Sequence, residues 1–417
     1  MNLENIYNSN KDSIIGFNHD NFNNYRKKLI DNFTLDNKIL KNNDSTKFFD
    51  NKILKNLKYS FNNSKESFEF ISSKNKDNKK SIIINNGNQY KLNNFNSENM
   101  EIFSFQNKQD EIMKKILENK DKFDNDYIVN LNSILLNSSL NFTLDKDSDE
   151  EISINHNVSE NGSTIYSKNF FSIKENSKLV IIENFNNSSE SNLNVLNFID
   201  IGKNSEVIHL VLQSNSIKSN LQFTTYIENQ ENSKFHQFIF NTSDGFVRNH
   251  HYADLKKNNS EVTLNGVFMA SSNQIVDNKT SIRHLEENCK SNQTYKAILT
   301  DKAKASYLSN TFVDQKAQKT SGYQLSKGIL LSEESFFHSK PELEIYADDV
   351  KCSHGSTIGT FDKDVLFYLR TRGLNETDSK KLLIKSYYLD LIEDINNENF
   401  KNELERLSNI WINEKNK

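Results

Sequence analysis

The residues best suited to chemistry gather in one short stretch. Residues 341–355 read PELEIYADDVKCSHG and contain the only proline and one of the two cysteines of the chain. Cys352 and His354 are separated by one residue, so in an extended strand their side chains point to the same face. A thiolate beside an imidazole suits a soft or borderline metal such as iron or zinc. The pair therefore predicts half of a tetrahedral metal site.

The other half of this site must come from another strand or from a partner chain. Within this sequence, Asp277 and His284 are the candidates for the missing ligands. Two other interpretations of the pair stay open: a buried cysteine beside a hydrogen-bonded histidine, or a nucleophilic Cys–His pair. The nucleophilic interpretation lacks an obvious orienting group and oxyanion hole near the pair.

Other candidate residues predict structure more than chemistry. His250 and His251 are adjacent and point to opposite faces of a strand, so they cannot chelate one metal together. Arg248 is expected to be a salt-bridge partner. The chain has no P-loop, dinucleotide-binding, zincin or nucleophile-elbow motif. With 11 glycines in 417 residues, a phosphate-binding loop is not expected, and neither is nucleotide hydrolysis by this chain.

Composition excludes several classes of protein. Lys+Arg 52 against Asp+Glu 56 gives a net charge of -4, which offers no general attraction to nucleic acid or to an anionic membrane. The apolar runs are far shorter than the roughly 20 residues of a transmembrane helix. Two cysteines cannot build a disulfide framework, and residues 1–5 lack the features of a secretory signal. We expect a soluble intracellular protein without a nucleic-acid or membrane partner.

A repeat organises the middle of the chain. An Asn-Ser corner followed by a charged residue and an apolar strand recurs with its serines at 177, 205, 233 and 260, so the steps are 28, 28 and 27 residues. Weaker echoes occur at Ser306 and Ser335. A fixed period of this length is typical of a solenoid, and repeats made of strands predict a β-solenoid. The alternative is a β-sandwich with evenly spaced turns, although sandwich turns typically recur every 8–12 residues or so.

Helical patterns flank the repeat. Before it, helices are expected around Tyr25, Leu29 and Phe33 and over 109–120, while 124–136 is ambiguous and 81–84 reads as a short strand. The predicted division is a mixed helical region over 1–150, a β-helix core over 151–360 and a helical domain over 361–417.

The C-terminal region predicts two amphipathic helices. Asn375 and Asp378 suit an N-cap followed by an acidic first turn. Apolar residues then recur at helical spacing in two stripes, Leu383, Tyr387, Leu391 and Ile395, and Phe400, Leu404, Leu407 and Trp411. We expect these stripes to be buried partly within the tail and partly against a partner.

Residues 339–355, SKPELEIYADDVKCSHG, resemble the signature of the SufB/SufD family of the SUF iron–sulfur cluster assembly machinery. The run from Asp348 to His354 is closer to the SufD branch than to SufB. The resemblance covers about 160–395, and it extends to Asp277–Thr280 with His284, Gln318–Thr320 with Gln324, Phe367–Arg370 and Arg372-Gly373.

This resemblance implies a fold and a set of partners. The fold is a right-handed parallel β-helix with helical segments at both ends. The partners are a SufB-like scaffold subunit, bound through the β-helix, and a SufC-like ATPase, bound through the C-terminal helices; the isolated chain is a candidate homodimer. The family also implies a bacterial cytoplasm, or alternatively a plastid.

The function implied is that of a non-enzymatic scaffold with no catalytic residue. His354, with Cys352 beside it, would hold a nascent Fe–S cluster that is transient and shared with the partner. Two alternatives are a β-helix enzyme acting on polysaccharide and a purely structural β-solenoid. The enzyme needs carboxylate pairs on one face, whereas Asp348 and Asp349 are adjacent and are expected on opposite faces.

Overall fold

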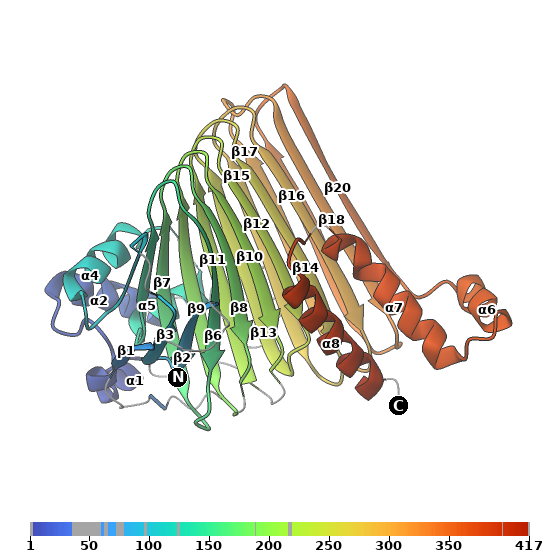
Figure 1. The fold of residues 1–417 in the computed structure, drawn as a ribbon, viewed down its shortest axis with the longest axis horizontal. Helices are drawn as coiled ribbons and strands as arrows, with labels where there is room; N and C mark the ends of the chain where they lie inside the picture. Colours follow the sequence, from blue (N-terminus) through green and yellow to red (C-terminus); the bar gives the residue numbers. More distant parts are fainter. Residues whose placement is uncertain are drawn as a thin grey trace.

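The computed structural model describes residues 3–35, 60–61, 66–71, 79–95, 98–122, 126–187, 189–215, 219–393 and 395–415. Two sheets face each other across one core, and each coil of the chain contributes one strand to each sheet (Figure 1). Between β6 and β20 every pairing within the sheets is parallel, which confirms the β-solenoid. The sandwich alternative is therefore wrong.

The strands follow in a fixed order across each sheet. The eleven-stranded sheet consists of β1 (Ser67–Ile71), β3 (Gln89–Asn93), β2 (Lys80–Asn85), β6 (Asp149–Asn157), β8 (Lys178–Phe185), β10 (Glu206–Gln213), β12 (Lys234–Asn241), β14 (Glu261–Ala270), β16 (Lys290–Leu299), β18 (Thr320–Leu330) and β20 (Val350–Gly359). The nine-stranded sheet consists of β19 (Phe336–Ile345), β17 (Lys304–Val313), β15 (Ile275–His284), β13 (Gly245–Leu255), β11 (Ser219–Asn229), β9 (Asn192–Ile201), β7 (Thr164–Ile173), β5 (Leu140–Leu144) and β4 (Met100–Ser104).

The predicted corner is a stack of left-handed asparagines. Asn176, Asn204, Asn232 and Asn259 all have φ between 56° and 60°, a conformation that asparagine tolerates better than most residues. Each donates its side-chain amide to the residue one coil earlier at 3.0 Å, from Asn176 on Asp147 to Asn259 on Asn232. The Ser177 N–H likewise donates to Ser205 Oγ at 3.0 Å. The predicted period therefore marks one corner of the solenoid.

Beyond Ser260 the corner continues at residues that the repeat did not predict. At the next coil Cys289 follows the left-handed Asn288, and its Sγ lies 3.3 Å from Ser260 Oγ. At the coil after that, Thr320 follows the left-handed Lys319. Ser306 lies in β17 and Ser335 directly precedes β19, so both belong to the nine-stranded sheet. Neither echo therefore continues this corner.

A row of charged residues begins the strands that follow this corner. These residues lie in register across the eleven-stranded sheet, and their charges alternate in sign: Asp149, Lys178, Glu206, Lys234, Glu261 and Lys290. Lys178 and Glu206 lie 2.7 Å apart, and Lys290 and Glu261 lie 2.8 Å apart. Opposite charges directly across neighbouring strands favour this register.

N-terminal elements cover the outer face of the nine-stranded sheet. They are α1 (Leu3–Ser9), η1 (Lys11–Ser13), α2 (Asp20–Leu35), α4 (Gln109–Glu118) and α5 (Tyr127–Ile134). The helix over 109–120 is confirmed, with Ile112, Met113 and Ile116 buried. Residue 150 falls inside β6, and the division into three domains stays a prediction.

The helix around Tyr25 is also confirmed, but a different face of it is buried. Phe22, Arg26 and Ile30 lie in the interface instead of Tyr25 and Leu29, which are only partly buried, and the side chain of Phe33 lies outside the described residues. Arg26 is accommodated because its guanidinium donates to the backbone oxygens of Ile15 and Ser133. Sequence periodicity alone does not anticipate an arginine in such a stripe.

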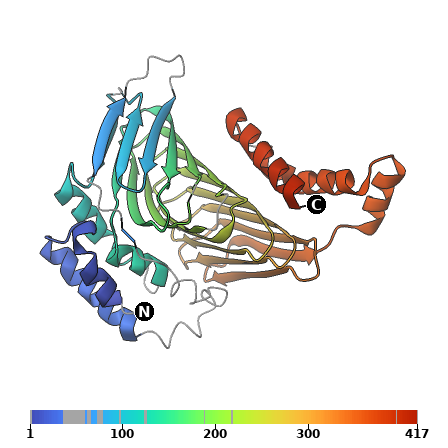
Figure 2. The same cartoon turned by 90° about the horizontal axis from the view of Figure 1, so that it is seen from below.

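The C-terminal helices α6 (Lys363–Thr371), α7 (Glu376–Ile392) and α8 (Glu398–Lys415) lie on the opposite side of the solenoid (Figure 2). Asn375 caps α7 as predicted, accepting the Asp378 N–H at 2.8 Å. The stripe of Phe400, Leu404, Leu407 and Trp411 is buried against outward residues of β10, β12, β14 and β16: Leu210, Leu212, Phe238, Phe240, Val267, Met269 and Ile298.

The tail therefore covers its apolar stripes within this chain. On α7 the buried stripe is Ile384, Tyr388 and Ile392, one residue beyond the predicted Leu383, Tyr387 and Leu391. These three are half-buried, and Tyr387 and Leu391 pack against the same cluster. The expectation that the stripes are buried partly against a partner is wrong for the stripe on α8, which packs on the solenoid instead. None of the helices in the described parts of the chain is long and apolar enough to cross a membrane.

Candidate functional site

The last coil places Cys352 and His354 at an exposed end of the solenoid. β20 is the final strand of the eleven-stranded sheet and β19 is the final strand of the nine-stranded sheet. In register with β18, Cys352 lies opposite Gly322 and His354 opposite Gln324. Gly322 and Gln324 are buried inward-facing positions, so Cys352 and His354 face the interior from the edge strand, as the alternation of strand faces predicts.

Cys352 is half-buried at this end. It packs against Val313, Ala317 and Ala347. Its sulfur lies close to Gly322 on the neighbouring strand, since a Cβ added to that glycine would be 3.4 Å from Cys352 Sγ. Burial raises the pKa of the Cys352 thiol above its ordinary value. A thiol binds metal as the thiolate, so this residue needs a nearby cation to lose its proton at neutral pH.

His354 continues a row of inward residues along the eleven-stranded sheet. Pairing in register gives the row His209, Gln237, Leu264, Gln293, Gln324 and His354, one residue per coil. The imidazole of His354 is exposed because no further coil follows it, whereas the members of the row from His209 to Gln324 are buried. The end of the solenoid thus presents an imidazole backed by buried amides.

The two further ligands suggested within this chain do not join the pair. Asp277 and His284 lie in β15 on opposite faces of the nine-stranded sheet. Asp277 faces outward, where it accepts from Ser306 Oγ at 2.5 Å and lies 3.1 Å from His250 Nε2. His284 faces inward, where its Nε2 lies 2.8 Å from Ser291 Oγ. Among the residues that the structure describes, no three His, Cys, Asp or Glu side chains form a metal-binding group.

The two aspartates of the signature lie in a turn. Asp348 and Asp349 precede β20 instead of lying in a strand, so their assignment to opposite strand faces was wrong. Both are exposed, and this turn connects β19 to β20 at the open end.

An ionic cluster fixes the N-terminal helices to the nine-stranded sheet. Asp126, the N-cap of α5, accepts from Arg248 Nη2 at 2.9 and 3.0 Å and from the Tyr252 hydroxyl at 2.8 Å. Burial opposes ionisation of Asp126, yet Arg248 and His250 hold its pKa well below the ordinary value. The prediction that Arg248 forms a salt bridge is confirmed by its ion pair with Asp126. His250 and His251 lie on opposite faces of β13, as predicted.

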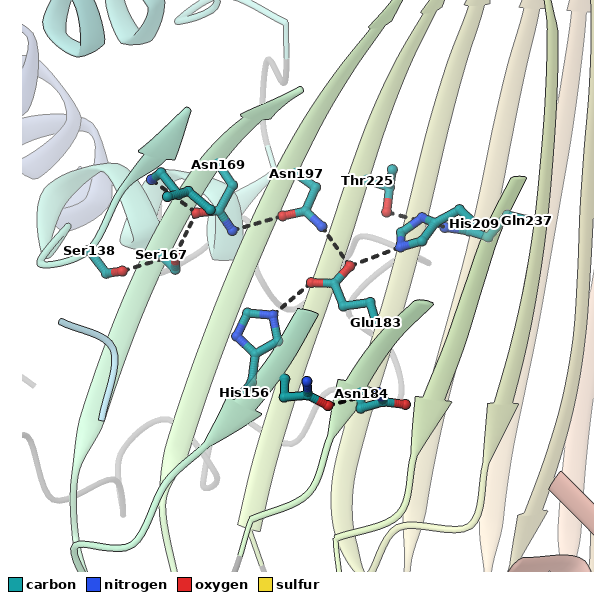
Figure 3. Close-up of polar contacts among 12 residues, drawn as sticks. Ser138, His156, Ser167, Asn169, Glu183, Asn184, Asn197, His209, Thr225 and Gln237 are labelled. Carbon is teal, nitrogen blue, oxygen red and sulfur yellow. Dashed lines mark hydrogen bonds and ion pairs between the residues drawn. The ribbon is translucent and has the colours of Figure 1, made fainter. Parts of the chain in front are cut away.

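A second polar cluster lies inside the solenoid, and the sequence reasoning missed it (Figure 3). The carboxylate of Glu183 lies 2.7 Å from His156 Nε2 and 2.9 Å from His209 Nε2, and it accepts from Asn197 Nδ2 at 2.9 Å. Glu183 is fully buried, which disfavours its charge, but these hydrogen bonds prevail and lower its pKa to about 2. Glu183 alternates with the inward-facing Leu179, Ile181 and Phe185 along β8. A charged residue at such a position is the sequence signal that could have revealed the cluster.

This cluster continues through further hydrogen bonds. Gln237 Nε2 donates to His209 Nδ1 at 3.2 Å, so His209 carries its proton on Nε2 and donates it to Glu183. Toward the N-terminal coils, Asn197 is linked by hydrogen bonds to Asn169 and Ser167 and then to Ser138 (Figure 3). The network is buried between the two sheets, and its arrangement indicates a structural role.

Comparison with known proteins identifies the family of this chain. Residues 155–387 match the SufBD core domain of SUF system FeS cluster assembly, more than half of the chain, and the chain belongs to this family. SufD of Escherichia coli (strain K12) is 34% identical over 169 residues, which cover 40% of each chain.

Two further relatives match shorter segments. A SufBD family protein of Synechocystis, slr0076, is 38% identical over 122 residues, 29% of this chain and 27% of its own. The chloroplastic protein ABCI7 of Arabidopsis thaliana is 35% identical over 114 residues, 27% of this chain and 24% of its own. The chain thus matches less than half of the length of these relatives.

Proposed function

We propose that this chain is a non-enzymatic scaffold subunit of an iron–sulfur cluster assembly complex, and that a nascent cluster is held at the open end of its solenoid. The observation that carries the proposal is the placement of Cys352 and His354 together on the inward face of the edge strand β20. Two ligands form half of a site, so a second chain supplies the rest.

The second chain is a SufB-like subunit that docks on the last coil. Edge strands expose unpaired N–H and C=O groups, which another sheet can pair with. β19 and β20 are both edges here, and Ile345, Tyr346 and Ile358 leave apolar surface exposed beside them. Docking of a second solenoid end would cover this surface and place Cys352 and His354 at the seam.

The ATPase partner is a SufC-like subunit that docks on α6 and the start of α7. Val365, Phe367, Tyr368, Leu374 and Leu382 are exposed there, in a segment that extends away from the solenoid (Figure 2). Gly373, at φ +96°, ends α6 in a conformation that favours glycine and directs the chain into α7. This surface replaces the α8 stripe as the docking site for the ATPase. The proposed location of the complex is a bacterial cytoplasm or a plastid.

The test is anaerobic co-expression of the chain with its SufB-like and SufC-like partners, followed by measurement of iron and sulfide in the isolated complex. His354→Ala should leave the complex assembled and lower its iron and sulfide content sharply, because water replaces an imidazole ligand poorly. Ser353→Ala, a change on the opposite face of the same strand, is the control. Equal iron and sulfide in the His354→Ala and unmutated complexes would overturn the proposal.

A further inference from the structure

Gln324 is the buried residue in register with His354, and its side-chain orientation is defined. Its Nε2 donates to Thr311 Oγ1 at 2.7 Å and to the backbone oxygen of Glu342 at 3.2 Å. A backbone carbonyl can only accept, so the amide nitrogen must be the atom on that side. The oxygen Oε1 is therefore directed elsewhere.

That oxygen is buried and has no hydrogen-bond partner in the described parts of the chain. Gln324 itself is only 3% exposed. A buried acceptor without a donor is unfavourable, so a donor is expected to complete it. His354 stands on the next strand at the same register, and adjacent strands are about 4.8 Å apart. An imidazole N–H at that position can reach Gln324 Oε1.

We propose that Gln324 is a positioning residue for the iron site: its Oε1 accepts the N–H of one ring nitrogen of His354 and leaves the other nitrogen unprotonated toward iron. This inference rests on the proposed function. A histidine that binds a metal usually donates its second N–H to an oxygen, which fixes its tautomer and ring orientation. Gln324 supplies that oxygen from a side chain already held by Thr311 and Glu342.

The chain contains a matched control for this role. Gln293 is the same residue type in the same row, one coil deeper, and its Nε2 donates to the same Thr311 Oγ1 at 2.9 Å. Its Oε1 is also buried and without a partner among the described residues. The neighbour of Gln293 on the next strand is Gln324, whereas the neighbour of Gln324 on the next strand is His354. A structural role predicts similar effects at both positions, whereas a positioning role predicts an effect at Gln324 alone.

The experiment uses the full complex with its two partners and Fe²⁺ as the probe. Gln324→Met should weaken Fe²⁺ binding by about 10-fold or more, the effect typical of losing such a supporting hydrogen bond. Gln293→Met should stay within about twofold of the unmutated complex, by the same reasoning. Equal effects of the two substitutions, or no effect of either, would overturn the inference.

A spectroscopic measurement on the unmutated complex covers the case in which Gln324→Met does not fold. With ¹⁵N-histidine in this chain, the signals of His354 are identified by their loss in His354→Ala. In the unmutated complex they should show a single tautomer; where Gln324→Met folds, it should show a mixture of two. A mixture in the unmutated complex would overturn the inference. If His354→Ala lowers iron and Gln324→Met does not, only the positioning role fails; if His354→Ala has no effect, the proposed function fails.

Discussion

At the scale of single residues, the buried carboxylate of Glu183 should make stability depend on pH. Its pKa is lowered from 4.5 to about 2 in the folded chain, so its contribution is present above pH 4.5 and is lost as the pH falls toward 2. The loss should be on the order of 3 kcal/mol in the free energy of unfolding. Urea unfolding at a series of pH values should show a steeper acid loss for the unmutated chain than for Glu183→Gln.

The control for this measurement is Glu231→Gln. Glu231 is a partly exposed glutamate whose pairing with Lys203 lies on the surface. Surface pairs contribute little, about 0–1 kcal/mol, so this variant should keep the acid loss of the unmutated chain. Identical pH profiles for Glu183→Gln and the unmutated chain would show that folding does not lower the pKa of Glu183.

The two thiols should differ in reactivity in the isolated chain. Burial raises the pKa of both, so the thiolate fraction of each is small at neutral pH. Cys289 is also sealed at the corner, whereas Cys352 is half-exposed at the solenoid end. Iodoacetamide should therefore label Cys352 slowly at pH 7 and faster at higher pH, and leave Cys289 unlabelled, as read by peptide mass spectrometry. Labelling of Cys289 in the native chain would contradict the corner packing.

At the scale of elements, an apolar interface, an ion pair and hydrogen bonds such as that from Asn397 to Glu151 hold the C-terminal helices to the solenoid. Trp411 is buried in this interface, and Lys296 Nζ lies 2.5 and 2.7 Å from the carboxylate oxygens of Asp390. Trp411→Ala should weaken docking of the tail by about 3–5 kcal/mol, the usual cost of removing a buried aromatic side chain. Limited proteolysis should then cleave the tail faster while the solenoid stays resistant.

The exposed surface of α6 should behave in the opposite way. Phe367 is 69% exposed, so Phe367→Ala should leave the melting temperature unchanged and weaken capture of the SufC-like ATPase. Retention of full ATPase binding by Phe367→Ala, or a large loss of stability, would place the docking surface elsewhere. Ile410, exposed on α8, provides the matched control substitution to alanine.

The element scale also shows how far the sequence carried the prediction. The four Asn-Ser corners were predictable because a left-handed asparagine recurs at successive coils with a nearly fixed period. The buried face of α7 was not, because Leu383, Tyr387 and Leu391 lie beside an equally apolar stripe of Ile384, Tyr388 and Ile392. Only packing on the sheet decides between two such stripes. Cys352 and His354 were found by spacing and by resemblance. Gln324 was named by the resemblance without a role, and only strand register placed it beside His354.

At the scale of the whole molecule, the last coil of the solenoid leaves one edge strand in each sheet. Helices cover the outer faces of both sheets, while β19 and β20 remain edges. Ile358 is 47% exposed on β20. Ile358→Lys should therefore leave the chain folded and weaken binding of the SufB-like subunit, because a charge would be buried in the seam. Size-exclusion chromatography of the mixed subunits would detect the loss, and Ile410→Lys, on α8, is the control.

The alternating charge row constrains how such a solenoid can lengthen. The corners at Asn204, Asn232 and Asn259 make the same Asn bond, so the backbone would accept an extra coil within this regular region. Duplicating one coil, residues 206–233, would however place two glutamates side by side in a row that reads Lys178, Glu206, Lys234 and Glu261. Duplicating two coils, 206–260, would preserve the alternation. Growth by internal duplication should therefore proceed in pairs of coils.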